Sequence, residues 1–283
     1  MFIKGKKRLN EDTSSTTKVY LGEDSIGREV IIKEDCSERN LLEQEAKTLT
    51  SLNKGNIRCP QMYEFVKKYK DKPTTLYMEY IRGKTLDKYI EIATLKEKLK
   101  VILDVACIIY SMNGIGYKHC DLKPQNIIIP NESKDYSIIK VDDQYFKCNA
   151  KVIDFDISRA YGSQGFHTKN YASFEQRANL PLGNETDVQS LAIMMYEILF
   201  NEIPRLAINF SNTNWSDRTK IAFPDNKYSI LAKEHSSSNE DNIKKNIYTL
   251  EKLYLESMIA DREKRIKINV FIKNLKKVTE KLK

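Results

Sequence analysis

Hydrophobic and polar residues alternate over much of the first 81 residues, which is typical of half-buried strands. Residues 18–33 alternate on both sides of a short polar turn and predict a hairpin of two strands. Residues 40–52 instead place apolar side chains at helical spacing, and residues 60–69 and 74–81 again favour strands. The pattern therefore predicts a small, mostly β unit that contains one helix.

Beyond Gly83 the apolar residues recur at helical spacing. One apolar stripe runs from Leu95 to Ile109, and residues 188–200 are apolar nearly all round, which predicts a buried helix. Residues 268–282 are amphipathic, which favours a packed helix and leaves a membrane-surface helix as the alternative. Residues 235–242 are polar and predict a loop. The two parts of the chain together predict an α+β fold.

The composition narrows the possible partners. The chain of 283 residues has a net charge of +8 and no run of about 18 apolar residues, so we expect no membrane span. Its basic start lacks the apolar stretch of a secretory signal. The charge favours either an anionic partner or a lysine-rich surface, and the even spread of the lysines favours the surface. We expect no nucleic-acid partner, because no recognised nucleic-acid module is present.

The five cysteines are odd in number and include no C-x-x-C pair. This pattern argues against a disulfide framework and a zinc site, and it favours a reducing compartment. We therefore expect a cytoplasmic protein, or one in a host cytosol if the chain is a viral or injected effector protein. The sequence indicates no oligomeric state.

The clearest chemical motif is HCDLKPQNIII at residues 119–129, which places a histidine, an aspartate, a lysine and an asparagine just before a buried strand. Asp121, Lys123 and Asn126 match the catalytic loop H-R-D-L-x-x-x-N of protein kinases, with Cys120 in place of the arginine. On this motif the chain resembles the Hanks-type Ser/Thr protein-kinase superfamily.

The resemblance extends over almost the entire chain, since further landmarks follow in the order of the family. They are Lys33 at the end of Val30-Ile31-Ile32-Lys33, Glu45 on the next helix, Asp154-Phe155-Asp156, Ser173-Phe174-Glu175, Asp187, and Asp261 with Arg265. Glu45 is preferred to Glu43 as the partner of Lys33, because Glu43 has a lysine at the helical i+4 position. In the family His119 packs under Phe155, and Arg265 pairs with Glu175.

The resemblance implies a bilobal kinase fold, with an N-lobe at residues 1–81 and a C-lobe at residues 82–283 of one catalytic domain. It implies that Lys33 holds the α and β phosphates of ATP, with GTP not excluded, and that Glu45 orients Lys33. The implied nucleotide site also includes Val19, Ile31, Met78, Glu79, Ile81 and Ile128.

The remaining implied roles concern the transfer step. Asp154 and Asn126 would bind Mg²⁺ or Mn²⁺, because hard cations prefer oxygen ligands. Asp121 would take the proton of the acceptor hydroxyl, and Lys123 would offset charge on the γ phosphate. Lys123 and Thr168 follow the Ser/Thr form of the family, so the expected partner is a protein substrate with a Ser or Thr acceptor.

Four departures from the family pattern change the expectation. Residues 12–19 lack the three glycines of the phosphate loop, which predicts weaker or reshaped nucleotide binding. Cys120 cannot anchor a phosphorylated residue, so we expect no need for activation-loop phosphorylation. Asp156 replaces the glycine of D-F-G and restricts the backbone, and Ile31 narrows the space over the base.

Two other functions stay open. A non-catalytic pseudokinase that acts as a scaffold is favoured by the lost glycines. A small-molecule phosphotransferase of the aminoglycoside or choline type shares the loop with Asp121 and Asn126. The segment at 131–150 is longer than the family norm, and we expect it to extend a hairpin, with a docking surface as one hypothesis for its role.

Overall fold

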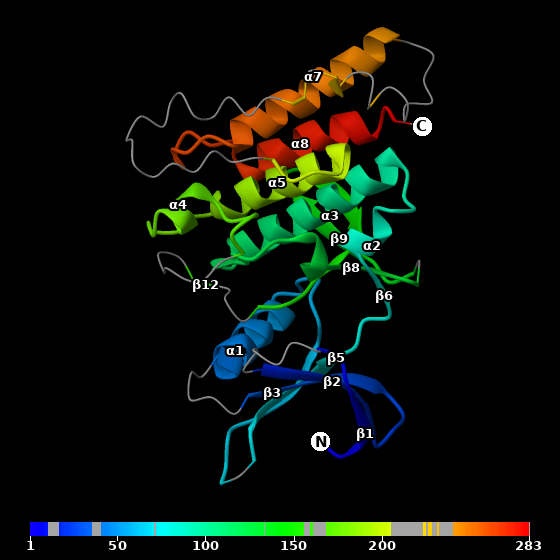
Figure 1. The fold of residues 1–283 in the computed structure, drawn as a ribbon, viewed down its shortest axis with the longest axis vertical. Coiled ribbons are helices and arrows are strands. Elements are labelled where there is room, and N and C mark those ends of the chain that lie inside the picture. Colours follow the sequence, from blue (N-terminus) through cyan, green and yellow to red (C-terminus); the bar gives the residue numbers. More distant parts are fainter. Residues whose placement is uncertain are drawn as a thin grey trace.

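The computed structural model of the protein describes residues 1–10, 17–35, 41–70, 72–132, 134–155, 159–160, 168–204, 223–224, 226–227, 231 and 240–282. Over these residues a sheet-rich N-terminal part stands against a helical C-terminal part (Figure 1). The predicted α+β fold of two lobes is confirmed. Within the described part of the chain, no helix is both long enough and apolar enough to cross a bilayer.

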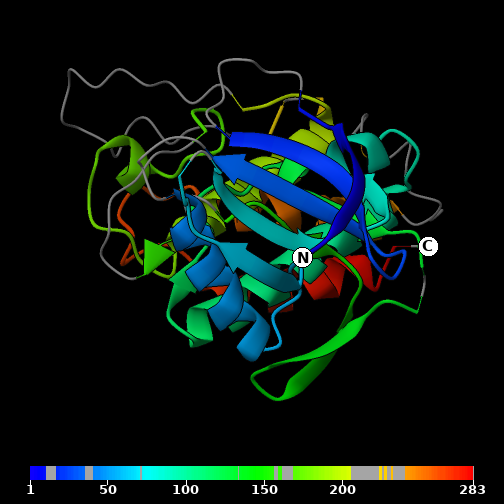
Figure 2. The ribbon, with the colours of Figure 1, turned by 90° about the horizontal axis from the view of Figure 1, so that it is seen from below.

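The N-terminal part is a five-stranded antiparallel sheet in the order β1-β2-β3-β5-β4. Its strands are β1 (Ile3–Arg8), β2 (Thr17–Asp24), β3 (Glu29–Asp35), β4 (Met62–Val66) and β5 (Thr74–Glu79). The helix α1 (Leu41–Lys54) lies beside this sheet in Figure 2 and contacts β4 and β5. Its apolar stripe is buried, and both the predicted hairpin and the predicted helix are confirmed.

The strand β1 was not expected from the sequence. Every residue of β1 except Ile3 is exposed, so the strand has no alternating apolar pattern. It is held by backbone pairing along β2, and beyond its end Leu9 N–H donates to the carbonyl oxygen of Val19 at 2.8 Å. Backbone pairing of this kind leaves no signal in the hydropathy of a strand.

The long helices in the described residues of the C-terminal part are α3 (Leu95–Gly114), α5 (Thr186–Phe200), α7 (Glu240–Ser257) and α8 (Ile268–Thr279). The helix α3 contacts both α5 and α8, and α5 is buried along most of its length, as predicted. The apolar face of α8 packs on α3 and α7, which confirms the packed helix rather than a membrane-surface one.

The predicted loop at residues 235–242 is wrong in its last part. Glu240, Asp241 and Asn242 begin α7, while residues 235–239 lie outside the described residues. The two acidic residues favour the first turn of a helix, because the backbone dipole is positive there. Ile247 and Leu250 then supply the buried face.

Apart from one hairpin, the remaining described elements after β5 are short. They are β6 (Gly83–Thr85), α2 (Leu86–Tyr89), β7 (Tyr117–Lys118), the 3₁₀ turn η1 (Pro124–Asn126), β8 (Ile127–Pro130), β11 (Lys151–Val152), β12 (Arg159–Ala160) and α4 (Phe174–Arg177). Glycine is needed at Gly83, because a Cβ there would collide with the carbonyl oxygen of Ile129. The strands β6 and β8 of the sheet β11-β8-β6 therefore approach each other closely at Gly83.

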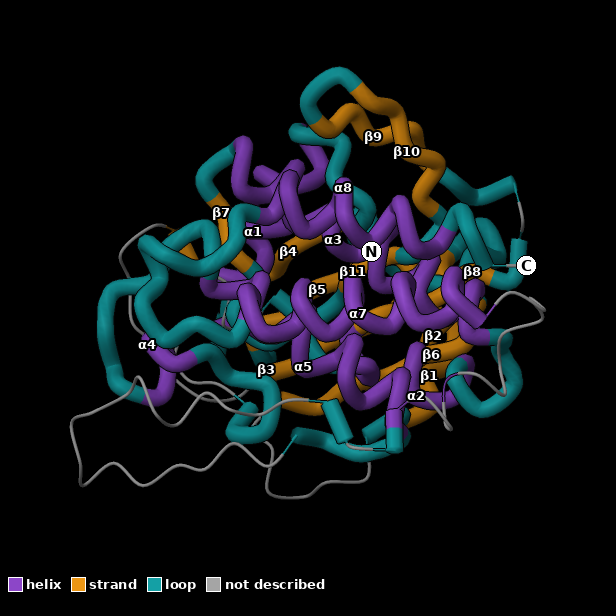
Figure 3. The backbone as a smooth tube through the Cα atoms, turned by 90° about the horizontal axis from the view of Figure 1, so that it is seen from above, coloured by secondary structure: helices purple, strands orange, loops and turns teal. Residues whose placement is uncertain are grey.

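The long segment between β8 and β11 forms the expected hairpin. Its strands are β9 (Ser137–Val141) and β10 (Gln144–Cys148), which pair antiparallel. Figure 3 shows this hairpin projecting at the edge of the molecule, near α8 and α3.

Candidate active site

A cavity of about 640 Å³ lies between the N-terminal sheet and the helical part. Its lining contains all eight residues expected at the nucleotide, namely Val19, Ile31, Lys33, Glu45, Met78, Glu79, Ile81 and Ile128. The two expected metal ligands, Asn126 and Asp154, line it as well. Asp121 and Lys123 are absent from the described lining of this cavity. Asp121 nevertheless lies next to it, because Asn126 donates a hydrogen bond of 3.2 Å to the Asp121 carboxylate.

Lys33 occupies the wall formed by β3 and is held by two carboxylates. Its ammonium lies 2.7 and 3.0 Å from the oxygens of Glu45 and 2.8 Å from Asp154 Oδ1. Burial disfavours the charged lysine, but the charges of Asp154 and Glu45 outweigh it and raise the pKa of Lys33. Lys33 therefore stays charged, fixed and directed into the cavity.

The choice between the two glutamates of α1 is settled by their neighbours. The Glu45 side chain is 1% exposed and contacts Lys33, whereas Glu43 pairs with Lys47 and Lys67 at the surface. The predicted pair of Lys33 with Glu45 is present.

Asp154 follows β11 and has a left-handed backbone, with a φ of 70°. The neighbouring charge of Lys33 lowers the pKa of its carboxyl group, so the carboxylate form is favoured. The next residue, Phe155, is buried with its ring centroid 5.0 Å from that of His119, as expected. The rest of the predicted D-F-G segment, Asp156, lies outside the described residues.

The Asp121 carboxylate is surrounded by donors. Lys123 Nζ lies 2.7 Å from Oδ2, and the Thr168 hydroxyl donates to Oδ1 at 2.5 Å. Asn126 Nδ2 donates to Oδ2 and, at 2.9 Å, to the carbonyl oxygen of Asp121. The predicted contacts of Thr168 with Asp121 and Lys123 are confirmed, since Lys123 Nζ also reaches the Thr168 hydroxyl at 3.2 Å.

Side chains of α5 and α4 bind the backbone of the loop at residues 119 and 120. The buried carboxylate of Asp187, in the first turn of α5, accepts hydrogen bonds from the N–H groups of His119 and Cys120, both at 2.8 Å. Gln176 Nε2 in α4 donates to the carbonyl oxygen of Cys120 at 2.6 Å. Cys120 has a φ of 69°, a strained conformation for a residue other than glycine that such bonds can maintain.

The helix α4 is itself anchored by a buried ion pair. Arg265 donates from Nη1 and Nη2 to the two oxygens of Glu175 at 2.9 and 2.8 Å. Both side chains are almost fully buried. Burial opposes ionisation of Glu175, but Arg265 lowers the pKa of this carboxyl group overall. The predicted pairing of Arg265 with Glu175 is present.

The side chains at the cavity suit a divalent cation. Asp154 offers a carboxylate that is 35% exposed. The amide nitrogen of Asn126 is engaged by Asp121, which leaves its amide oxygen as the atom for a cation. Two oxygen donors of this kind match the ligands preferred by Mg²⁺.

Several residues of the cavity wall were not predicted from the sequence, and Asn10 is a polar one with a clear structural role. Asn10 lines the cavity, donates from Nδ2 to the Thr17 carbonyl oxygen and accepts from Val19 N–H, both at 2.9 Å. It thereby joins the two ends of the segment in which the glycine-rich loop was sought, while residues 12–16 of that segment lie outside the described residues. Only the tendency of asparagine to bond nearby backbone could have signalled this role.

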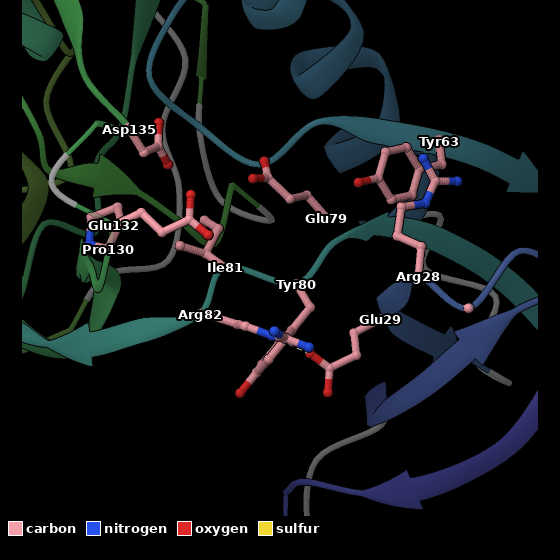
Figure 4. Close-up of a pocket in the computed structure, with 11 residues that line it drawn as sticks. Arg28, Glu29, Tyr63, Glu79, Tyr80, Ile81, Arg82, Pro130, Glu132 and Asp135 are labelled. Atoms are coloured by element: carbon pink, nitrogen blue, oxygen red, sulfur yellow. Dashed lines mark hydrogen bonds and ion pairs between the residues drawn. The ribbon is translucent and has the colours of Figure 1, made fainter.

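A smaller cavity of about 370 Å³ shares Glu79, Tyr80 and Ile81 with the first one. Figure 4 shows the ion pair between Arg82 and Glu29, whose nitrogen and oxygen are 2.6 Å apart. Lys151 Nζ lies 2.6 Å from Glu79 Oε1 and 3.3 Å from Asp135 Oδ2. The two Lys151 pairs connect the end of β5 to β11 and to the residues just before β9, whereas the Arg82 pair connects the segment after β5 to β3.

Comparisons with known proteins agree with this geometry. The family model described as protein kinase domain matches residues 17–274. Serine/threonine-protein kinase A of Synechocystis sp. is 27% identical over 183 residues, which cover 61% of this chain and 34% of that protein. Serine/threonine-protein kinase PrkC of Bacillus subtilis is 29% identical over 204 residues, which cover 66% and 28%.

A probable serine/threonine-protein kinase of Clostridium acetobutylicum is 31% identical over 140 residues, 46% of this chain and 19% of that protein. The chain thus spans about a third or less of the length of these relatives. The family model, in contrast, covers most of this chain. The chain therefore belongs to the protein kinase family and has its two-lobed fold.

Proposed function

We propose that the protein is an active kinase that transfers the γ-phosphate of ATP to Ser and Thr hydroxyls of proteins. The observation that carries the proposal is the convergence of Lys33, Asn126 and Asp154 on one cavity, with the Asp121 carboxylate hydrogen-bonded to Asn126. Members of the family in general use ATP and a divalent metal and act on protein substrates. We place the lobe boundary between residues 81 and 82.

Each side chain at the cavity then has a role that its surroundings support. Lys33, held by Glu45, would bind the α and β phosphates. Asp154 and Asn126 would hold Mg²⁺ or Mn²⁺, which when bound offsets the charge of the β and γ phosphates. The nucleotide base, adenine or guanine, would lie among Val19, Ile31, Met78, Glu79, Ile81 and Ile128.

The transfer step would use the Asp121 loop. A Ser or Thr hydroxyl of the substrate would donate its proton to the Asp121 carboxylate while its oxygen bonds to the γ phosphorus and the nucleoside diphosphate leaves. Lys123, 2.7 Å from Asp121, is placed to offset charge on the transferred group. Most of the catalytic benefit would come from this fixed charge arrangement.

The preference for Ser and Thr rests on two supports. Thr168 binds both Asp121 and Lys123, which is the arrangement of Ser/Thr kinases that the sequence resembles. The curated relatives also carry serine/threonine-protein kinase in their names.

Independence from activation-loop phosphorylation is part of the proposal. Cys120 has no positive charge with which to bind a phosphorylated residue. Its backbone is instead bound by a buried carboxylate and by an uncharged amide side chain. Asp187 and Gln176 hold this backbone through hydrogen bonds of 2.8 and 2.6 Å. The catalytic loop would therefore keep its geometry without a phosphate group nearby.

We also propose a cytoplasmic location. Within the described part of the chain, Cys59, Cys107 and Cys148 are buried free thiols, which suits a reducing compartment.

A nucleotide-binding scaffold without transfer activity is the second candidate. The absence of glycine from residues 12–17 favours it, because side chains there restrict how closely the backbone can approach phosphate. A small-molecule phosphotransferase is less well supported, since the ion pair of Glu175 with Arg265 belongs to the protein-kinase pattern.

The test is incubation of the purified protein with Mg²⁺ and labelled ATP or GTP, beside an Asp121→Ala variant. Label on Ser or Thr of the protein itself or of basic test proteins, absent from the variant, is the expected result. Nucleotide binding without transfer would favour the scaffold. Label found only on small amines or sugars would favour the small-molecule enzyme.

A further inference from the structure

A second large cavity, of about 690 Å³, lies beside the inserted hairpin. We call it the hairpin groove; it is bounded by β10, by the first half of α3 and by the end of α8. It shares no described lining residue with the active-site cavity, but the two are neighbours across β8. Ile128 lines the active-site cavity, whereas the adjacent Ile129 lines the hairpin groove.

The hairpin groove has an apolar floor. The lining includes the apolar side chains of Val101, Leu103, Ile129, Phe146 and Ala150. Its volume lies in the range of cavities that enclose several side chains or a drug-sized ligand. A bulky aliphatic or aromatic side chain would be removed from water there, which is the main source of affinity in such sites.

Lysines surround this floor. Lys96, Lys100, Lys147 and Lys276 line the groove and come from α3, β10 and α8. Lys147 Nζ lies 4.1 Å from the centre of the Tyr136 ring, and Lys276 Nζ lies 5.0 Å from the centre of the Phe146 ring. These aromatic contacts hold the ammonium groups at the rim while leaving them able to bind an anion.

Two of the carboxylates in the lining are already engaged within the protein. Asp104 is buried, pairs with Lys100 and accepts from the backbone N–H of Asn149 at 2.8 Å. Glu97 closes the N-terminal cap of α3 with Thr94. The third, Glu280, lies 3.7 Å from Lys276. Lys96 and Lys147 are exposed and form no ion pair within the described residues, so the rim presents positive charge.

We propose that the hairpin groove docks a segment of the protein substrate in which bulky apolar residues are flanked by Asp and Glu. Carboxylates of the segment would pair with the lysine rim, and its apolar side chains would occupy the floor. Docking here would hold the acceptor near the active site on the other side of β8. The role in substrate choice rests on the proposed function, whereas the binding itself does not.

The binding test uses a library of fluorescein-labelled peptides of 12 residues, each with two positions of Leu, Ile, Met or Phe within an Asp- and Glu-rich sequence. Fluorescence anisotropy is measured without nucleotide, so an inactive kinase would still report binding. The test variant is Lys96→Glu with Lys147→Glu. The matched control is Lys4→Glu with Lys7→Glu, which makes the same charge change at exposed positions of β1.

The expected result is saturable binding of acidic-apolar members, weakened about tenfold in the groove variant and unchanged in the β1 control. Replacing the apolar residues of the peptide by Gly should abolish binding. Equal loss in both variants would show attraction to net charge alone and overturn the proposal, as would binding of no library member at millimolar peptide. Tighter binding of Lys-rich peptides or anionic vesicles would overturn it as well.

A kinetic arm tests the link to substrate choice. The best binding peptide is joined to a Ser-containing acceptor, and KM is compared with that of the bare acceptor. We expect the docking segment to lower KM in the unaltered protein and in the β1 control but not in the groove variant, with kcat equal in all three. An unchanged KM in the unaltered protein would overturn the link to substrate choice.

Discussion

The ion pair between Arg265 and Glu175 leads to a sharp prediction, because it anchors α4, whose Gln176 binds the backbone of the loop that carries Asp121. Arg265 is 1% exposed and donates to both oxygens of Glu175, and further to the carbonyl oxygens of Ile259 and Glu185. Replacing it by methionine keeps much of the volume and removes the charge. Glu175 then remains buried without its counter-ion.

The size of the effect follows from this burial. Removing one partner of a buried ion pair costs about 3–5 kcal/mol, and each lost hydrogen bond to a carbonyl about 1 kcal/mol. Since the methionine regains part of this by packing, we expect Arg265→Met to lower the free energy of unfolding by about 4 kcal/mol. With a urea dependence of about 3 kcal/mol/M, the unfolding midpoint would fall by roughly 1.3 M.

The assay is urea unfolding followed by circular dichroism. The control is Lys264→Met, since Lys264 is 78% exposed and its pair with Asp261 should contribute under about 1 kcal/mol. The double variant Arg265→Met with Glu175→Gln should lose about 2 kcal/mol less than the sum of the single losses. A midpoint shift below about 0.3 M for Arg265→Met, or additive losses, would refute the reasoning.

Three further predictions concern the site and its pH dependence. Glu45→Gln removes a carboxylate from Lys33 and should reduce kcat/KM for transfer by about ten- to a hundredfold; an unchanged rate would mean that the pair is dispensable. Thr168→Val should slow transfer about tenfold, whereas Thr168→Ser keeps the hydroxyl and should not; equal rates would contradict this role. Because Arg265 lowers the pKa of Glu175 below 4.5 despite its burial, the pair stabilises the fold above that pH. This contribution is lost as the pH falls through the lowered pKa of Glu175. The urea midpoint of the unaltered protein should therefore fall more steeply below pH 4.5 than that of Glu175→Gln. Parallel plots of midpoint against pH for the two proteins would contradict the stabilising role of the ion pair.

Much of the site was predictable because its chemistry is unusual for its surroundings. Lys33 directly follows Val30, Ile31 and Ile32, and Asp121 and Asn126 precede three isoleucines, so these polar residues interrupt apolar stretches of the sequence. Such residues are conspicuous in a single sequence. The family spacing then predicted which of them meet, although Lys33 and Asp154 are far apart in the chain.

What the sequence did not reveal depends on backbone geometry. The left-handed conformations of Cys120 and Asp154 occur at residues other than glycine, so composition gives no warning of them. The strand β1 pairs through its backbone while most of its side chains are exposed. Such pairing does not depend on apolar side chains, so the hydropathy pattern cannot predict it. The start of α7 was hidden by a polar stretch whose acidic residues favour a helix end as readily as a loop.

The most direct test of the central claim is a crystal structure of the protein with Mg²⁺ and a non-hydrolysable ATP analogue. We predict that the nucleotide fills the cavity lined by Ile31 and Met78, and that the Lys33 ammonium binds its phosphates. Oxygens of Asp154 and Asn126 should bind the metal at about 2.0–2.1 Å. A nucleotide bound elsewhere, or a metal held by neither side chain, would contradict the account.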